Sequence, residues 1–338
     1  MVSVIIPVYN RFPLVNEMVK CILSQTFIDW ELLLVDDGST DGTYEKLQEF
    51  PHIDQRIKVI QRPANKKGAP VCRNIGLENA KGEYVIFFDS DDLVAPYCLE
   101  QRVCYMNSHS DVDAAVFPAR HFKESVHETN GLLNGIQIFR DDLEEFIGVN
   151  LPYIVWNVIF RRKCLFEKHI IWDEQLLSLQ DADFNIQCIL KGIKISYANT
   201  VNVDYYARAE NNNSVSAGIY KISRFDSHLH FVDKIFAVLP ADTHRKYRMA
   251  LYYRLVYIYI LMSYNYSKEH VEKLIDLSEK YDCLSCFFKI SIYINRFLID
   301  RLKIGVRISN MLIFPYFSLH MRTCYKKRNK YNRLKLIK

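Results

Sequence analysis

The sequence lacks several patterns that would assign a function directly. No uninterrupted apolar run reaches the roughly 18 residues needed to cross a bilayer as a helix. The nine cysteines form no cluster with histidines at zinc-ligand spacing, which argues against a structural zinc site. There is no Gly-x-Gly-x-x-Gly after the first strand-like run and no Gly-x-x-x-x-Gly-Lys-[Ser/Thr] anywhere, so a dinucleotide Rossmann site and a P-loop are disfavoured.

Acidic residues are missing from the C-terminal end. Residues 301–338 contain eleven Lys or Arg and no Asp or Glu, so the net charge of +5 belongs to this tail and the rest is net acidic. No signal peptide precedes the first apolar run, and the cysteine count is odd. We therefore expect reduced thiols and a cytoplasmic protein. The length of 338 residues suits one large or two modest domains.

The first 90 residues alternate between strand-like and helix-like patterns. Continuous apolar runs, typical of strands buried on both faces, cover residues 2–10, 30–37, 57–62 and 82–89. Helical patterns lie between them, over residues 13–25, 40–50 and 69–80. This alternation predicts an α/β fold with a mostly parallel sheet, in which ligands bind beyond the carboxyl ends of the strands.

The rest of the chain divides into two parts that differ in composition. Residues 113–122 and 195–208 are strand-like, and residues 179–192 have the spacing of a short helix. Beyond about residue 218 glycine is scarce, and Tyr, Ile, Leu, Lys and Arg dominate. The sequence therefore predicts a first domain over residues 1–217 and a helical C-terminal region over residues 218–338.

Polar side chains follow three of the predicted strands, and a parallel sheet would gather them at one edge. They are Tyr9 and Asn10, then Asp36 and Asp37, then Asp89, Asp91 and Asp92. Three carboxylates within four residues repel one another. They are either a helix cap with a solvated loop, or a site for Mg²⁺ or Mn²⁺, which take oxygen ligands and accept one or two carboxylates plus substrate phosphates.

Four further residues have two interpretations each. Asp36 and Asp37 form a turn, or accept hydrogen bonds from a base or a ribose. Arg73 is a surface charge, or faces a diphosphate. Asp181 opens a predicted helix and is either a favourable dipole partner or a general base for an acceptor hydroxyl.

Four segments in this order resemble family 2 glycosyltransferases. They are VSVIIPVYN (2–10), LSQTFIDWELLLVDDGSTDGT (23–43), CRNIGLENAKGEYVIFFDSDD (72–92) and QDADF (180–184). The resemblance covers about residues 1–215. It implies the GT-A fold, a nucleotide-diphosphate sugar as donor, and inversion at the anomeric carbon.

The resemblance also implies contacts with the nucleotide base. Pro7, Val8 and Tyr9 would line the base pocket. Asp37 would contact uracil, which points to a UDP-sugar, and Asp36 would support the same loop.

Further positions match the family's diphosphate and metal site. Arg73 would lie near the nucleotide. Asp89, Ser90 and Asp91 match the Asp-x-Asp motif, with Asp89 toward the ribose and Asp91 on Mn²⁺ or Mg²⁺. Asp92 would be a third member of this group.

The remaining assignments concern the acceptor side and the donor's diphosphate. Asp181 matches the catalytic acid of the family's Glu-Asp motif, although Gln180 stands where the family has Glu. Trp156 would form an acceptor-side wall, with a core tryptophan as the alternative. Arg208 and Ser214 would close over the diphosphate.

A mechanism follows from this resemblance. The metal would act as a Lewis acid on the departing diphosphate, and Asp181 would take the proton from the attacking hydroxyl. One displacement then inverts the anomeric carbon, so an α-linked donor gives a β-glycoside. The expected product is a surface polysaccharide or glycolipid. The alternatives are a catalytically silent protein that binds a sugar nucleotide or a partner, and a nucleotidyltransferase, whose glycine-rich loop the PVYNRF segment lacks.

The tail suggests a partner of a different kind. Residues 287–338 interleave large apolar side chains with Lys and Arg, which suits a helix lying on an anionic membrane. The alternative is a packed helical subdomain with a solvated basic end. A lipid-linked saccharide acceptor and a peripheral place on the inner face of the plasma membrane would fit the first interpretation. No recognition motif indicates nucleic acid.

Overall fold

A computed structural model describes residues 1–123, 130–199, 201–209, 221, 224–265, 267–282, 284–323 and 326. The chain divides into two compact units, which we call the sheet unit and the helical unit. The sheet unit comprises Met1–Gln137, Pro152–Glu174 and Gln180–Ala209. The helical unit comprises Ile138–Leu151, Gln175–Leu179 and Glu210–Lys338. The domain boundary predicted at residue 217 lies outside the described residues.

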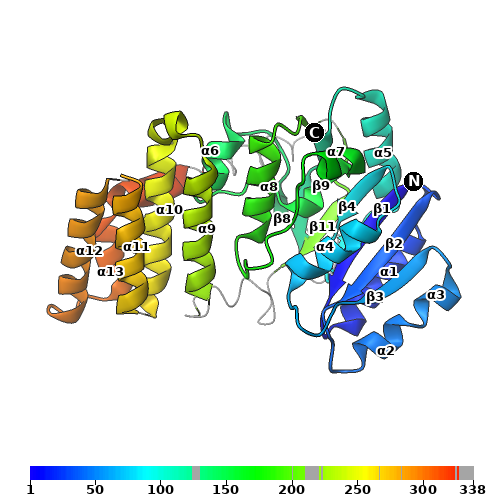
Figure 1. Cartoon of the computed structure of the whole chain (residues 1–338), viewed down its shortest axis with the longest axis horizontal. Helices are drawn as coiled ribbons and strands as arrows, with labels where there is room; N and C mark the ends of the chain where they lie inside the picture. Colours follow the sequence, from blue (N-terminus) through cyan, green and yellow to red (C-terminus); the bar gives the residue numbers. More distant parts are fainter. Residues whose placement is uncertain are drawn as a thin grey trace. The chain divides into compact units, whose positions relative to one another are not determined.

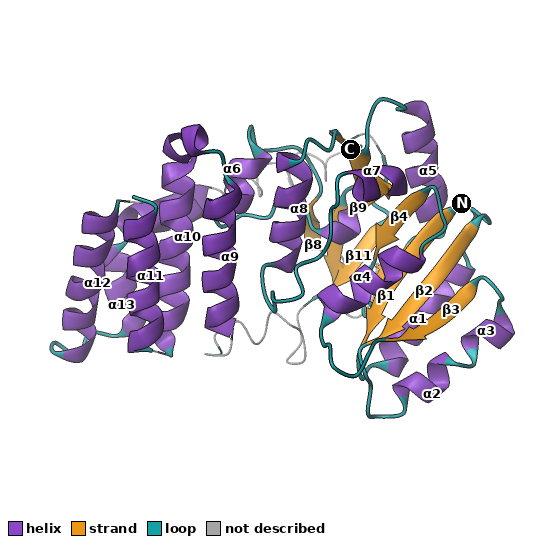
Figure 2. Ribbon diagram, viewed as in Figure 1, coloured by secondary structure: helices purple, strands orange, loops and turns teal. Residues whose placement is uncertain are grey.

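A seven-stranded, mostly parallel sheet forms the centre of the sheet unit (Figures 1 and 2). Its order is β10-β6-β9-β4-β1-β2-β3. The strands are β1 (Val2–Val8), β2 (Trp30–Asp36), β3 (Ile57–Gln61), β4 (Tyr84–Phe87), β6 (Ala114–Val116), β9 (Val158–Arg161) and β10 (Ile195–Tyr197). The strands β1 to β4 run parallel, and β9 runs antiparallel to both of its neighbours. The four apolar runs of the first 90 residues thus form the four parallel strands.

Helices accompany these strands as the alternating pattern predicts. They are α1 (Phe12–Leu23), α2 (Thr43–Leu47), α3 (Phe50–Ile53), α4 (Ala69–Asn79), α5 (Cys98–Ser108), η1 (Val155–Asn157), α7 (Arg162–Glu167) and α8 (Gln180–Leu190). The single helix predicted over residues 40–50 is instead two short ones. The reason is Pro51, which has no N–H to donate to the carbonyl of Leu47 and starts a new helix.

A second sheet of four strands, in the order β5-β11-β7-β8, completes this unit. Its strands are β5 (Leu93–Val94), β7 (Ala119–Phe122), β8 (Asn130–Asn134) and β11 (Tyr205–Arg208). The strand predicted over residues 113–122 is therefore wrong as one element, because β6 and β7 belong to different sheets. Pro118 separates them, and a proline cannot donate to a sheet's hydrogen-bond ladder.

The elements described in the helical unit are helices (Figure 2). They are α6 (Asp142–Ile147), α9 (Phe225–Val238), η4 (Ala241–Thr243), α10 (His244–Tyr264), α11 (Lys268–Lys280), α12 (Ser285–Asp300) and α13 (Val306–Ile313), and residues 315–323 are also helical. Arg254 on α10 donates to the carbonyls of Ile147 and Phe146 at 3.2 and 3.0 Å, which satisfies the end of α6. No helix among the described residues is long and apolar enough to span a membrane.

The strand register aligns the carboxyl ends of the central strands. Val8 of β1 lies opposite Asp36 of β2, and Asp36 lies opposite Gln61 of β3. On the other side, Ile5 of β1 lies opposite Phe87, the last residue of β4. The chain therefore leaves β1, β2 and β4 at the same edge of the sheet, where the polar residues after each strand come next.

Candidate functional site

The loops after β1 and β2 are tied together. The Asp37 N–H donates to the Val8 carbonyl at 2.8 Å, and the Asn10 N–H donates to the Ser39 hydroxyl at 3.0 Å. Asp36 is fully buried, and its Oδ2 accepts the N–H groups of Gly38 and Ser39 at 2.9 and 3.0 Å. The carboxylate thus holds the turn after β2 in shape.

Asp37 is held from two other segments. Its Oδ1 accepts the Arg62 Nε–H from the end of β3 and the Gly68 N–H at 2.8 Å from the start of α4. Gly68 has φ of +113°, a conformation that L side chains rarely adopt. Of the residues predicted to line a base pocket with Asp37, Val8 is buried, Pro7 is half-buried and Tyr9 is 40% exposed. This corner thus has a fixed carboxylate at Asp37 and an exposed aromatic ring at Tyr9, the residue after Val8, whose carbonyl accepts the Asp37 N–H.

Arg73 and Asp89 form an ion pair in which the arginine is the more deeply buried partner. Arg73 Nη2 on α4 donates to Asp89 Oδ1 at 2.7 Å, and the arginine side chain is only 3% exposed. Its Nε and Nη1 are buried without a hydrogen-bond partner. Burying unpaired guanidinium N–H groups costs free energy, so these two donors point to an anionic or hydroxylated ligand.

Asp91 faces a cation already present in the chain. Its Oδ2 forms an ion pair with Arg11 Nη1 at 2.8 Å. Burial raises the pKa of the Asp91 carboxyl, the charge of Asp89 raises it further, and the charge of Arg11 lowers it. Arg11 was not predicted as a site residue, although it directly follows the VYN segment.

Asp92 is engaged within the protein. Its Oδ2 accepts the Tyr205 O–H at 2.6 Å, and its Oδ1 accepts the Arg208 N–H at 2.7 Å. Arg208 in turn donates to the Asp91 carbonyl at 2.8 Å and pairs with Glu17 of α1 at 2.6 Å. Asp92 therefore fastens the acidic loop to β11.

Asp181 opens α8, as the helical spacing predicts. Its Oδ1 is buried without a hydrogen-bond partner, and so is Oε1 of Gln180. Burial raises the pKa of Asp181 to about 6; the charge of Arg73 acts against this shift, and that of Asp89 adds to it. Contacts of Trp172 with Arg73 and with Phe184 of α8 bring the helix that carries Asp181 next to Arg73. A carboxyl with a pKa near neutrality suits a general base.

Trp172 lies beside this group and was missed by sequence reasoning. The Arg73 guanidinium lies 4.5 Å from the centre of its ring, and Phe184 of α8 stacks on the ring at 4.3 Å. Asn74 fixes the backbone of Trp172 from α4, donating to its carbonyl at 2.9 Å and accepting its N–H at 2.8 Å. The tryptophan thus joins the helices that carry Arg73 and Asp181. No spacing rule reveals Trp172, because its contacts with Arg73 and Asn74 join residues about 100 positions apart.

Of three further predicted site residues, two are buried and one lies outside the described residues. Trp156 is 4% exposed and stacks on Tyr205 at 4.6 Å, which matches the alternative of a core tryptophan rather than an acceptor-side wall. Ser90 is buried between the two acids. Ser214 lies outside the described residues.

The donor atoms at this edge fit a hard divalent cation. Carboxylate oxygens are the ligands that Mg²⁺ and Mn²⁺ prefer, and the charge of Asp89 raises the pKa of Asp91, as expected for two neighbouring acids. Over the described ranges, no three His, Cys, Asp or Glu side chains gather into a site built by protein alone. The arrangement therefore suits a cation that completes its shell with a ligand's oxygens.

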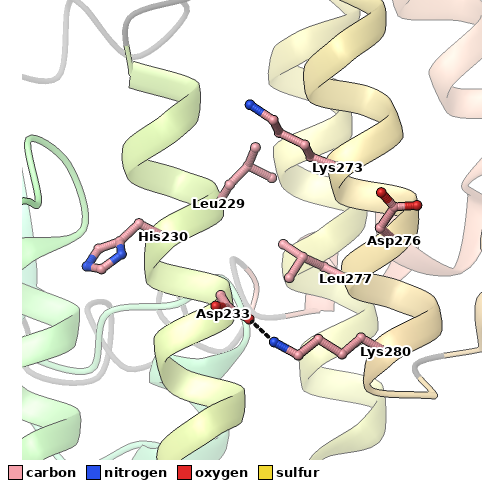
Figure 3. Close-up of a pocket in the computed structure, with 7 residues that line it drawn as sticks. All are labelled: Leu229, His230, Asp233, Lys273, Asp276, Leu277 and Lys280. Carbon is pink, nitrogen blue, oxygen red and sulfur yellow. Dashed lines mark hydrogen bonds and ion pairs between the residues drawn. The ribbon is translucent and has the colours of Figure 1, made fainter.

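A separate pocket of about 470 Å³ lies in the helical unit between α9 and α11 (Figure 3). Its lining residues are Leu229, His230, Asp233, Lys273, Asp276, Leu277 and Lys280. Asp233 pairs with Lys280 at 2.8 Å and accepts the Tyr281 O–H at 2.8 Å. These two bonds lower the pKa of Asp233, so it is an ion-paired acid, unlike Asp181.

A comparison with known families matches the part of the chain that contains most of the predicted site residues. The sequence model of glycosyl transferase family 2 matches residues 3–171, half of the chain. The chain belongs to glycosyl transferase family 2. The matched range contains every predicted site residue except Asp181, Arg208 and Ser214.

Curated relatives carry glycosyltransferase names. The glycosyltransferase EpsJ of Bacillus subtilis is 28% identical over 238 residues, 68% of this chain and 66% of EpsJ. The cholesterol galactosyltransferase of Borreliella burgdorferi is 27% identical over 333 residues, 91% of this chain and 90% of that protein. The chain spans just under two thirds of EpsJ and less than half of the teichuronic acid biosynthesis glycosyltransferase TuaG of Bacillus subtilis.

Solved structures share the fold. Residues 1–349 of Staphylococcus aureus TarS, in complex with UDP-GlcNAc, match with a TM-score of 0.63 at 19% identity, covering 95% of this chain and 91% of that one. The mannosyltransferase PcManGT of Pyrobaculum calidifontis, in complex with GDP-Man and Mn²⁺, matches with a TM-score of 0.52 at 17% identity, covering 85% and 84%. The predicted family and the predicted GT-A fold with a helical C-terminal region are both confirmed.

Proposed function

We propose that this chain is a metal-dependent, inverting glycosyltransferase that moves a sugar from a nucleotide-diphosphate sugar to an acceptor hydroxyl. One observation carries the proposal. In a family 2 fold, a carboxyl with a raised pKa and a buried Oδ1 that has no hydrogen-bond partner is subject to the charges of Arg73 and of the first acid of the Asp-x-Asp motif. A base beside a diphosphate site is what single displacement requires.

The donor's base and ribose would bind at the loops after β1 and β2. Pro7, Val8 and Tyr9 would contact the base, Asp37 would accept its N–H, and Asp36 would keep the loop in place. The TarS neighbour, whose structure contains UDP-GlcNAc, supports a UDP-sugar as the first donor to test.

The diphosphate and the metal would meet Arg73, Asp89 and Asp91. Asp91 would hold Mn²⁺ or Mg²⁺ and Asp89 would face the ribose; the PcManGT neighbour contains Mn²⁺. When bound, the ion would supply Lewis acidity for the leaving diphosphate. Arg11 would have to leave Asp91 Oδ2 for that oxygen to bind the ion, since the two cations would compete for one ligand.

Asp181 would carry the acid–base step. Its free Oδ1 would accept the proton of the acceptor hydroxyl as that oxygen attacks the anomeric carbon from the face opposite the diphosphate. The unpaired Nε–H and Nη1–H of Arg73 would bind the departing diphosphate and offset its growing negative charge.

The acceptor would be a saccharide or a lipid-linked saccharide, in the synthesis of a surface polysaccharide or glycolipid. Among the relatives, the name of the poly(ribitol-phosphate) β-glucosyltransferase supports a surface polymer as the product, and that of the cholesterol galactosyltransferase supports a glycolipid. Such acceptors would suit a cytoplasmic protein at the inner face of the plasma membrane.

The direct test is a panel of UDP- and GDP-sugars, assayed for Mn²⁺-dependent donor hydrolysis and for donor binding by calorimetry. We expect Asp91→Asn to weaken both metal and donor binding. We expect Asp181→Asn to bind the donor as tightly as the wild type and to lose turnover by about 100-fold or more, the usual contribution of a general base. Asp111→Asn, at an exposed aspartate of the same unit, is the matched control.

Two outcomes would contradict the proposal. Turnover by Asp181→Asn at the wild-type rate would exclude Asp181 as the base. Tight donor binding with no turnover of any sugar nucleotide would favour the silent binding protein instead.

A further inference from the structure

The helical unit has polar side chains inside. Asn295 on α12 donates to Ser309 Oγ and Asn310 Oδ1 on α13 at 2.9 and 3.0 Å. The Tyr259 O–H on α10 donates to Asn295 Oδ1 at 2.8 Å, and Asn310 donates to Ser263 Oγ at 3.0 Å. All five side chains are buried. Helices α10, α12 and α13 are thus joined by a hydrogen-bonded network in their interior.

The opposite side of α12 is apolar and exposed. Five large side chains there are between 46% and 61% exposed: Phe287, Ile290, Tyr293, Ile294 and Phe297. Positions three, four and seven residues apart lie on one side of an α-helix, so these five form one stripe. Asn295 lies on the buried side together with Phe288 and Ile292, so α12 carries large apolar side chains on both sides.

The following helix repeats this pattern. On α13, Ser309 and Asn310 are buried, whereas Ile308, Met311 and Leu312 are between 48% and 59% exposed. We call these exposed apolar side chains, five on α12 and three on α13, the outer apolar faces. Exposed apolar side chains in such number mark a surface that contacts a partner protein or a membrane.

The charges around the outer apolar faces are mostly positive, and the nearby acids Asp300 and Glu279 are paired with Arg296 and Lys289. Arg301 and Lys303 follow α12, Arg307 lies on α13 and Arg322 lies in the helical stretch 315–323; all four are exposed. The sequence from residue 285 to its end has a single acidic residue, Asp300. A second copy of this surface would carry the same positive charge and would repel it, whereas an anionic surface would attract it.

We propose that the outer apolar faces of α12 and α13 dock on an anionic lipid bilayer. Aromatic and aliphatic side chains would enter the boundary between head groups and acyl chains, and the arginines and lysines would contact the lipid phosphates. The buried hydrogen bonds would hold α10, α12 and α13 together while the exposed apolar side chains contact lipid rather than water. This binding is independent of sugar transfer, so it can fail or succeed without affecting the proposed function.

Vesicle flotation of the full chain tests this surface. We expect the wild type to float with vesicles containing phosphatidylglycerol, to bind phosphatidylcholine vesicles less, and to detach as the salt concentration rises. The double variant Ile290→Ser with Phe297→Ser should lose about tenfold in vesicle affinity, because two apolar side chains no longer enter the lipid. Ile28→Ser with Ile53→Ser, at exposed positions of the sheet unit, is the matched control and should bind as the wild type does.

Circular dichroism and donor hydrolysis in solution would verify that both double variants are folded. Three results would overturn the proposal: a wild type that ignores anionic vesicles, a double variant at 290 and 297 that binds them equally, or a control that loses as much affinity. A stable dimer in sedimentation equilibrium that the same substitutions dissociate would also overturn it, in favour of a second copy as the partner.

Discussion

Asp181 is a carboxylate whose surroundings favour the protonated form. Burial penalises its charge and Asp89 repels it, while Arg73 and a backbone hydrogen bond favour ionisation. The result is a pKa of about 6, above the ordinary range for aspartate. The carboxyl is therefore protonated in acid and ionises near neutral pH, with its buried Oδ1 free to accept a proton.

We predict that turnover at low donor concentration rises with pH through about 6, because only the ionised Asp181 accepts a proton. Below that pH, kcat/KM should fall about tenfold per unit of pH, as expected for one essential base. The check is a pH profile of initial rates, with donor binding measured at the same pH values. A profile that is flat between pH 5 and about 7 would contradict the assignment.

Trp172 joins elements that are far apart in the sequence. Its ring lies against Phe184 on α8 and against Phe87 at the end of β4, and the Arg73 guanidinium of α4 lies over it. Through these contacts, one side chain fixes the helix that opens with Asp181, the strand before the acidic loop, and the arginine between them. We infer that Trp172 is a positioning residue for the site.

We predict that Trp172→Leu lowers kcat about tenfold or more and shifts the midpoint of the pH profile, because Arg73 and α8 lose a common support. Trp172→Phe should recover most of both, since it keeps an aromatic face. Each change should also lower the free energy of unfolding, by roughly 1–3 kcal/mol.

The matched control is Trp30→Leu on β2. Trp30 is equally buried and has the Arg56 guanidinium 3.7 Å from its ring centre, at the amino end of the strand. It should lose similar stability without moving the pH midpoint. An equal shift in both variants would show that Trp172 acts on stability alone.

The elements also show what the sequence can and cannot predict. Continuous apolar runs locate β1 to β4, because strands buried on both faces need apolar residues throughout. The break at Pro118 between β6 and β7 was not predicted, because the two strands belong to different sheets and the sequence pattern does not show which sheet a strand joins. The bond between Asp92 and Tyr205 connects residues 113 apart, so spacing could not reveal that Asp92 fastens β11. The acids themselves were predictable, whereas Arg11 and Tyr205, which bind Asp91 and Asp92, and Trp172, which contacts Arg73, were not.

At the scale of the whole molecule, the two units differ in what they expose. The sheet unit places charged residues at one edge of a mostly parallel sheet, within the range that matches family 2. The helical unit buries a polar network and exposes apolar side chains beside arginines and lysines. A nucleotide-sugar site on one unit and a lipid-facing surface on the other would suit an enzyme whose acceptor is attached to a membrane.

The most direct test of the central claim is the configuration of the first product. The wild type is incubated with an α-linked sugar nucleotide that it hydrolyses or transfers, and the anomeric proton is followed by NMR from the earliest time. Single displacement assisted by Asp181 predicts a β-product that forms before any mutarotation. An α-product appearing first would contradict the account.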